Sequence, residues 1–129
     1  MKNYEEIKKN LEERKDRSAW DKGVTIYALE LLDEVAEQID YTGKEPETRA
    51  ELKALALNGA ESWEEYSWGG SALIYNGDIA ERLCTPSELK KTRGGERRPN
   101  SREEWLDTQA RALYQAFRRL AIAWGSVNN

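Results

Sequence analysis

The chain has 129 residues, of which 39% are hydrophobic and 34% are charged, and its net charge is −4. This length predicts one domain covering residues 1–129, and the composition predicts a folded protein with a highly charged surface. With no histidine and a single cysteine, Cys84, the sequence lacks the commonest general base and excludes both an internal disulfide and the usual zinc site of nitrogen and sulfur ligands.

Apolar residues recur every three to four positions along the first part of the chain, which is typical of amphipathic α-helices. The first predicted helix covers about residues 4–11, and Asn3 with Glu6 predicts its capped start. The second covers about residues 18–39, begins at Ser18 and carries a row of acidic residues opposite its apolar face. We expect this second helix to form half of the core.

Shorter elements follow in the middle of the chain. Thr48 and Glu51 form a capping box that predicts a short third helix, and Gly59 is placed to end it. A further short turn is expected at residues 62–66. Residues 71–83 are ambiguous between a strand and a helix, and we favour helix or irregular coil because the sequence offers no obvious partner strand.

Two more capping boxes occur in the C-terminal part. The one at Thr85 and Glu88 predicts a short helix that ends near Thr92. The other opens a long last helix over about residues 101–124, which Gly125 is expected to end. The predicted fold is therefore all-α: a single-domain bundle built on two long helices, about 18–39 and 101–124, with several short helices around them.

Charge is distributed unevenly along the chain. Residues 1–66 carry 10 Lys and Arg against 17 Asp and Glu, whereas residues 67–129 carry 10 against 7. The positive charge concentrates in a glycine-containing segment, residues 90–102, whose basic residues are Lys90, Lys91, Arg93, Arg97, Arg98 and Arg102. Arginine forks suit phosphate oxygens, so this segment is a candidate anion or nucleic-acid site. The alternative is a solvated loop whose charge offsets the acidic half.

The basic segment matches none of the common phosphate or DNA motifs. Its lysines precede Gly94-Gly95 instead of following them, so it is not a Walker A loop. The expected helices at residues 78–84 and 86–91 are too short to make a convincing helix-turn-helix. If nucleic acid binds here, about three to five phosphates would be engaged and the affinity would fall steeply with salt.

Aromatic residues form a second candidate site. Trp20, Trp105 and Trp124 fall on helical apolar stripes and are expected in the core. Four others lie in a segment interrupted by Gly69-Gly70 and could form a surface for a protein partner or stacked bases: Trp63, Tyr66, Trp68 and Tyr75. The alternative is a satellite cluster that anchors a region without long helices.

Enzyme chemistry finds little support in the sequence. The pairs Glu64-Glu65 and Asp78/Glu81 could act as acid and base or bind a hard cation, but helix starts already account for most of them. Cys84 is either a reactive thiol or a small buried apolar residue, which is the commoner case. We therefore expect no catalytic activity, no cofactor and no metal.

Longer motifs carry a resemblance over most of the chain. They are Arg17-Ser18-Ala19-Trp20, Ser67-Trp68-Gly69-Gly70, Leu73-Ile74-Tyr75 and the stretches 82–92, 99–107 and 109–113. In these motifs the chain resembles a family of small uncharacterised proteins carried on plasmids, prophages and conjugative elements of Gram-positive (Firmicutes) bacteria. The resemblance implies an accessory protein of mobile DNA and carries over no functional residues.

Two hypotheses for function follow from the sequence. In the first, the chain is a non-enzymatic accessory protein that binds another protein through its aromatic residues or acidic helices. In the second, it binds nucleic acid or phosphate through the basic segment 90–102. The lone cysteine, the charged N-terminus and the lack of a long apolar run lead us to expect a cytoplasmic protein without membrane contact. The oligomeric state is left open.

Overall fold

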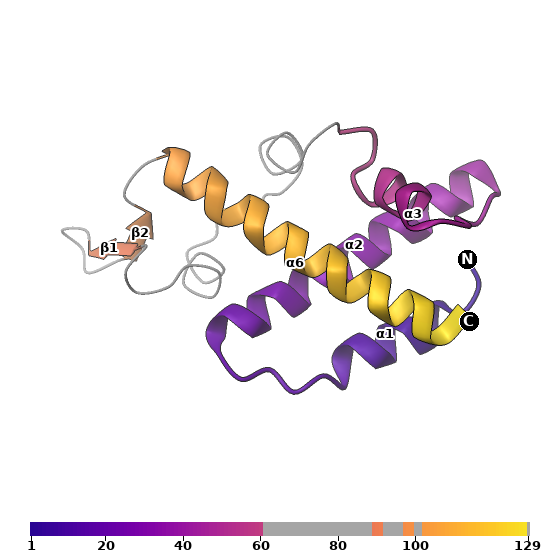
Figure 1. The fold of residues 1–129 in the computed structure, drawn as a ribbon, viewed down its shortest axis with the longest axis horizontal. Helices are drawn as coiled ribbons and strands as arrows, with labels where there is room; N and C mark the ends of the chain where they lie inside the picture. Colours follow the sequence, from indigo (N-terminus) through magenta and orange to yellow (C-terminus); the bar gives the residue numbers. More distant parts are fainter. Residues whose placement is uncertain (61–88, 92–96, 100–101, 129) are drawn as a thin grey trace.

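The computed structural model describes residues 1–60, 89–91, 97–99 and 102–128. In these ranges the chain is mainly helical, and it also forms one short two-stranded ribbon (Figure 1). The elements are α1 (Tyr4–Glu12), α2 (Ala19–Thr42), α3 (Arg49–Ala56), β1 (Leu89–Lys91), β2 (Arg97–Pro99) and α6 (Arg102–Asn128). The expected all-α class is confirmed, and so are the two long helices.

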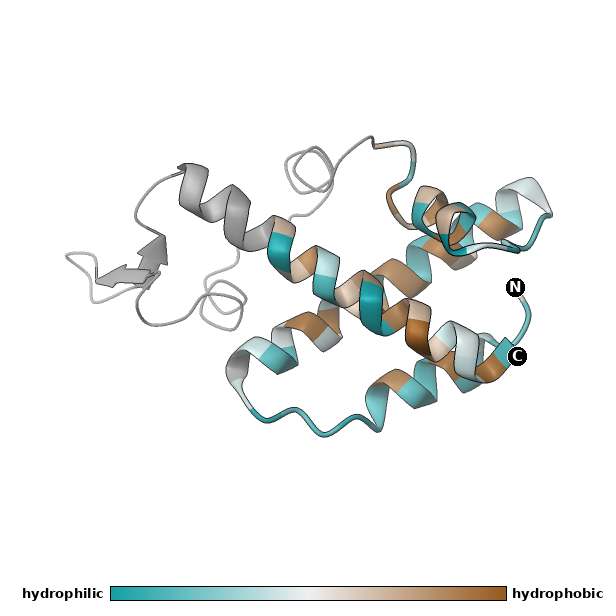
Figure 2. Ribbon diagram, in the orientation of Figure 1, coloured by the Kyte–Doolittle hydropathy of each residue, from teal (hydrophilic) through white to brown (hydrophobic). Residues whose placement is uncertain are grey.

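The two long helices cross each other and carry most of the core (Figure 1). Side chains that repeat at helical spacing on α2 and α6 are buried where the helices meet, and Figure 2 shows apolar residues gathered on these inner faces. Removing this apolar surface from water is the main stabilising contribution to the fold. Among the residues whose burial is described, the buried apolar residues of the pair are Val24, Tyr27, Ala28, Leu31, Leu32, Val35, Ile39, Ala112, Leu113, Ala116, Phe117, Leu120 and Ala123.

The two short helices pack against the crossed pair. Ile7 and Leu11 of α1 are buried in the common core, and so are Leu52 and Ala56 of α3. Helix α1 contacts both α2 and α6, which brings the two chain ends side by side (Figure 1). Each short helix thus gains its stability from one apolar face laid on the long helices.

Two of the predicted helix starts are confirmed. The Ser18 hydroxyl accepts a hydrogen bond from the Asp21 backbone N–H at 3.1 Å, and Thr48 does the same for Glu51 at 3.1 Å. The start predicted at Asn3 is correct in position, because α1 begins at Tyr4, but the predicted capping bond is wrong. Asn3 has a left-handed backbone with φ of 62° and makes no capping bond; its side chain instead donates to Asn128 Oδ1 at 2.8 Å.

One predicted helix end is also wrong. Gly125 was expected to end the last helix, but α6 continues to Asn128. Two contacts stabilise the extra turn. Val127 packs against the core, and Asn128 Nδ2 donates to the Trp124 carbonyl at 3.0 Å. By contrast, Gly43 ends α2 in the left-handed conformation, with φ of 71° and its N–H on the Ile39 carbonyl.

The capping box at Thr85 and Glu88 led us to expect a helix through Thr92, and this is wrong for its last turn. Leu89–Lys91 form β1, which pairs antiparallel with β2. The sequence between the strands contains Gly94-Gly95, which suits the connection of a hairpin. Within the described parts of the chain, no helix is both long and apolar enough to cross a membrane.

Candidate functional site

The structure places four residues of the predicted basic segment on the two-stranded ribbon. Its register makes Lys90 the partner of Arg98 and Lys91 the partner of Arg97, so each of these pairs joins two cationic residues. A third pair, Leu89 with Pro99, closes the ribbon at its other end. We call these two strands, with Lys90, Lys91, Arg97 and Arg98, the basic ribbon.

Like charges placed directly opposite each other destabilise a pair of strands. A two-stranded hairpin is marginally stable in water even without such a penalty. The two cationic pairs of the basic ribbon therefore work against its stability unless an anion compensates their charge. Because strand residues alternate between faces, Lys90 and Arg98 belong to one face of the ribbon, and Lys91 and Arg97 belong to the other.

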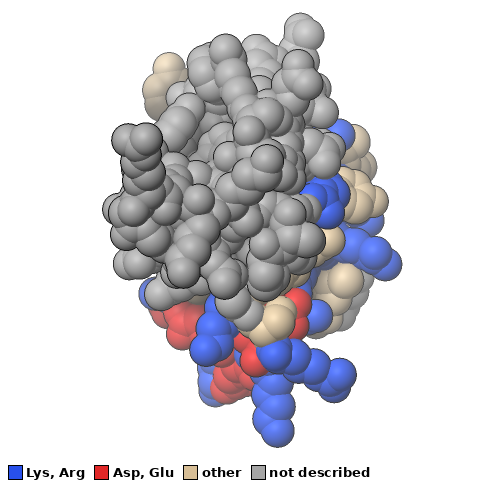
Figure 3. All heavy atoms as spheres, turned by 90° about the vertical axis from the view of Figure 1, so that its left-hand side faces the viewer, with Lys and Arg blue, Asp and Glu red and all other residues tan. Residues whose placement is uncertain are grey.

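The basic ribbon lies beyond the N-terminal end of α6, away from α1 and α3 (Figure 1). Arg102, another predicted site residue, is the first residue of α6. Figure 3 turns this end of the molecule toward the viewer, and the described surface around it shows lysine and arginine side chains with carboxylates among them.

The other predicted site residues lie outside the described residues. They are Arg93 of the basic segment and all four members of the aromatic candidate, Trp63, Tyr66, Trp68 and Tyr75. Two of the tryptophans that were expected in the core are described. Trp20 and Trp124 are both half-buried and pack against the core residues.

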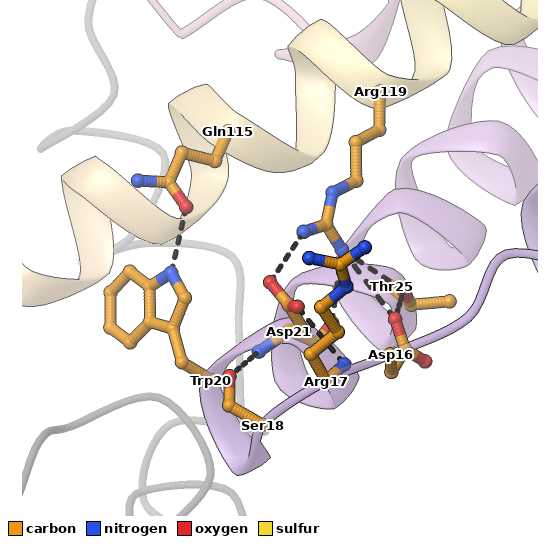
Figure 4. Close-up of polar contacts among 8 residues, drawn as sticks. All are labelled: Asp16, Arg17, Ser18, Trp20, Asp21, Thr25, Gln115 and Arg119. Carbon is orange, nitrogen blue, oxygen red and sulfur yellow. Dashed lines mark hydrogen bonds and ion pairs between the residues drawn. The ribbon is translucent and has the colours of Figure 1, made fainter.

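Sequence reasoning missed a polar cluster between α2 and α6 (Figure 4). The Arg119 guanidinium donates to Asp21 Oδ1 at 2.9 Å, to the Asp21 carbonyl at 3.0 Å and to Thr25 Oγ1 at 3.1 Å. Asp16 Oδ1 lies 3.9 Å from Arg119 Nη1 and accepts the Thr25 hydroxyl at 2.8 Å. The Arg119 side chain is only 11% exposed, so its charge is satisfied by protein groups.

Asp21 is held from its own helix start as well. Its Oδ2 accepts the Arg17 backbone N–H at 3.1 Å, and Arg119 binds the other oxygen. The Arg17 N–H, followed by Arg119, lowers the pKa of Asp21 below its ordinary value, although burial acts in the opposite direction. The carboxylate therefore stays charged and committed to these donors.

Trp20 extends the same junction by one more contact. Its indole Nε1 donates to Gln115 Oε1 at 2.7 Å, and the Arg111 guanidinium lies 5.8 Å from its ring centre (Figure 4 shows the Gln115 bond). Every polar group named in this cluster has a partner within the protein. The cluster thus ties the start of α2 to α6.

A sequence signal for this cluster existed. Arg119 lies three residues after Ala116 and four before Ala123, so it falls on the buried stripe of α6. A charged residue on an apolar stripe needs a buried partner. The partner itself could not be found from spacing, because Asp16 and Asp21 lie about a hundred positions away.

A groove runs between the start of α3 and the last part of α6, with a volume of about 310 Å³. Its apolar walls come from Pro46 and Leu52 on one side and from Ile122 and Trp124 on the other, with small residues Ala121 and Gly125 between them. Ile122, on this groove, is 59% exposed. Glu47, Thr48 and Arg49 complete the rim.

Comparisons with protein-family models, curated proteins and solved structures find no match for this chain. Its function must therefore be argued from its own residues. Among the residues described, no group of three or more His, Cys, Asp or Glu is placed to hold a metal ion. The basic ribbon and the groove are the two features from which a function is argued below.

Proposed function

We propose that this chain is a non-enzymatic protein that binds nucleic acid through the basic ribbon. The observation that supports it is the register, which pairs Lys90 with Arg98 and Lys91 with Arg97. A row of phosphates is the partner that turns such repulsive pairs into favourable ones, because each cation can neutralise one phosphate and release its counterion. Arg102 at the start of α6 adds a fifth cation close by in the sequence.

The biological setting is proposed from the resemblance alone. A cytoplasmic accessory protein of a plasmid, prophage or conjugative element would meet nucleic acid in the course of the element's maintenance or transfer. Neutralising phosphates gives affinity without sequence preference, and sequence is read only by contacts to base edges. We therefore propose general, not sequence-specific, binding.

Salt dependence is the experiment that tests this proposal. Binding of labelled duplex DNA, single-stranded DNA and RNA is measured by fluorescence anisotropy at several salt concentrations. Four or so neutralised phosphates give a log–log slope of about −3 to −4, so the affinity of duplex should fall roughly a hundredfold between about 50 and 200 mM salt. The Arg97→Ala/Arg98→Ala variant should bind more weakly, and its slope should be shallower by about two.

The matched control is Lys8→Ala/Lys9→Ala. It removes the same charge from α1, which lies far from the basic ribbon (Figure 1). Lys8 pairs with Glu12 and Lys9 pairs with Glu13 at the surface, and such i,i+4 pairs contribute little to stability. Equal loss of binding in both variants would mean that net charge alone attracts nucleic acid. Failure to bind any of the probes at low salt would reject the proposal.

A protein partner is the second candidate function. Four aromatic residues close together in the sequence, Trp63, Tyr66, Trp68 and Tyr75, are of the type that dominates protein interfaces. A pull-down from a host lysate tests this candidate with wild type and a Trp63→Ala/Trp68→Ala variant. Retrieval of the same proteins by both would exclude these tryptophans as the contact.

A further inference from the structure

We propose that the groove between α3 and α6 is filled by a second copy of this chain, whose Tyr41 side chain enters it. The proposal goes beyond nucleic-acid binding, since it concerns the opposite part of the molecule and needs no ligand. It is supported by three observations: the groove itself, a highly exposed tyrosine, and a matching pair of charges that have no ion-pair partner among the described residues.

The groove has the size and lining for one side chain of a partner. Its volume of about 310 Å³ lies at the lower end of the range for ligand pockets. A groove of this volume is larger than a water molecule needs and too small for a large cofactor. Pro46, Leu52, Ile122 and Trp124 provide apolar contacts. Thr48 and Glu47 on the rim provide polar atoms. An amphipathic aromatic side chain suits such a lining, with its ring in the apolar part and its hydroxyl at the rim.

Tyr41 is the most exposed large hydrophobic residue in the described part of the chain, at 89%. It stands in the last turn of α2, next to Thr42, and the chain then turns at Gly43. Helix propensity does not explain a tyrosine here, because it ranks below the straight-chain residues at an exposed helical position. Its ring points to solvent and is not buried in the core, which lies on the other side of the helix.

The charges beside Tyr41 and beside the groove are complementary. Glu37 lies one turn before Tyr41 on α2, and Arg118 lies one turn before Ile122 on α6, so each charge shares a helix face with its apolar neighbour. Both charged side chains are exposed, and neither has an ion-pair partner among the residues that the structure describes. When α2 of one copy runs parallel to α6 of the other, with Tyr41 against Ile122, Glu37 meets Arg118 at the same one-turn spacing.

Sedimentation velocity of the protein without nucleic acid tests the proposal from about 1 to 300 µM, the range in which a small interface dissociates. Wild type should self-associate within this range. Tyr41→Ala should raise the dissociation constant at least about tenfold, because it removes the central aromatic anchor. Wild type that stays monomeric throughout, or a Tyr41→Ala variant that associates as wild type does, would overturn the proposal.

A charge swap provides the sharper test. Glu37→Arg and Arg118→Glu should each weaken association about three- to tenfold at low salt, and the double variant should return to within about twofold of wild type. All of these positions are exposed, so folding should be retained, and circular dichroism checks it. Glu13→Arg makes the same charge change just after α1 and should leave association unchanged. A double variant that is weaker than both single variants would contradict the proposed pairing.

Discussion

Arg119 on α6 and Asp21 on α2 hold the two long helices together at the start of α2. Arg119 Nη2 donates to Asp21 Oδ1 at 2.9 Å, and Nη1 donates to the Asp21 carbonyl at 3.0 Å. The arginine thus binds both the side chain and the backbone of the same residue. The Arg17 N–H and the Ser18 hydroxyl hold Asp21 from the other side, so the whole helix start is fixed against α6.

Replacing Arg119 with alanine should destabilise the protein. The substitution leaves Asp16 and Asp21 without their shared cation, and breaking such a buried pair is costly, about 2 to 4 kcal/mol in the free energy of unfolding at this partly exposed site. Urea unfolding at neutral pH measures it. The control is Arg118→Ala, an exposed neighbour whose loss should change stability by less than about 0.5 kcal/mol. If Arg119→Ala lowered the free energy of unfolding as little as Arg118→Ala does, the cluster would contribute no stability.

Asp21 should make the protein sensitive to acid. Its pKa is lowered in the folded state by the Arg17 N–H and by Arg119, from an ordinary value of 3.8. A lowered carboxyl pKa stabilises the folded state above the ordinary pKa, and this stability is lost as the pH falls through the folded-state pKa. Urea midpoints measured from pH 7 down to acid should therefore fall less steeply for Asp21→Asn than for wild type. Parallel curves would show that Asp21 does not contribute.

The Tyr4 hydroxyl donates a hydrogen bond to Asp33, which joins α1 to α2. This bond is the main reason that the pKa of Tyr4 is raised to about 12. Because the neutral phenol is favoured in the folded state, the associated stability is present below the ordinary pKa of 10.0 and is lost as the pH rises through about 12. Ultraviolet titration should show a late-ionising tyrosine whose transition shifts to lower pH in Asp33→Asn. An unchanged titration in that variant would argue against the bond.

Two aliphatic residues on the last helix should respond differently to truncation. Leu120 is fully buried, so Leu120→Ala should cost about 2 to 5 kcal/mol through lost burial and the cavity that remains. Ile122 is 59% exposed, and Ile122→Ala should cost less than about 1 kcal/mol when the protein is dilute. Thermal unfolding at low protein concentration compares them. An equal loss of stability in the two variants would mean that Ile122 is buried, in contradiction to its exposed position in the structure.

The Thr48 cap should contribute measurably to stability. Its hydroxyl accepts the Glu51 N–H, and the Glu51 carboxylate accepts the Glu47 N–H at 2.7 Å. Thr48→Ala removes the first bond and should cost about 1 kcal/mol, whereas Thr48→Ser keeps the hydroxyl and should cost less. Urea unfolding measures both. No difference between the two variants would show that water replaces the cap.

Much of the candidate site was visible in the sequence, but its arrangement was not. The basic residues of segment 90–102 could be named from composition alone. Their pairing across two strands could not, because a capping box at Thr85 and Glu88 favours a helix locally and strand pairing depends on residues several positions away. The groove escaped prediction for a similar reason, since its walls come from residues about seventy positions apart.

The apolar stripes of the helices and the capped starts at Ser18 and Thr48 could be predicted from the sequence alone. These features depend on contacts between residues three or four positions apart, and such contacts form within a single helix whatever it packs against. Tertiary packing, in contrast, determines that Arg119 meets Asp21, that Asn3 binds Asn128 and that α6 continues past Gly125. Those contacts exist because packing of α2 against α6 brings distant residues together, and local spacing carries no information about them.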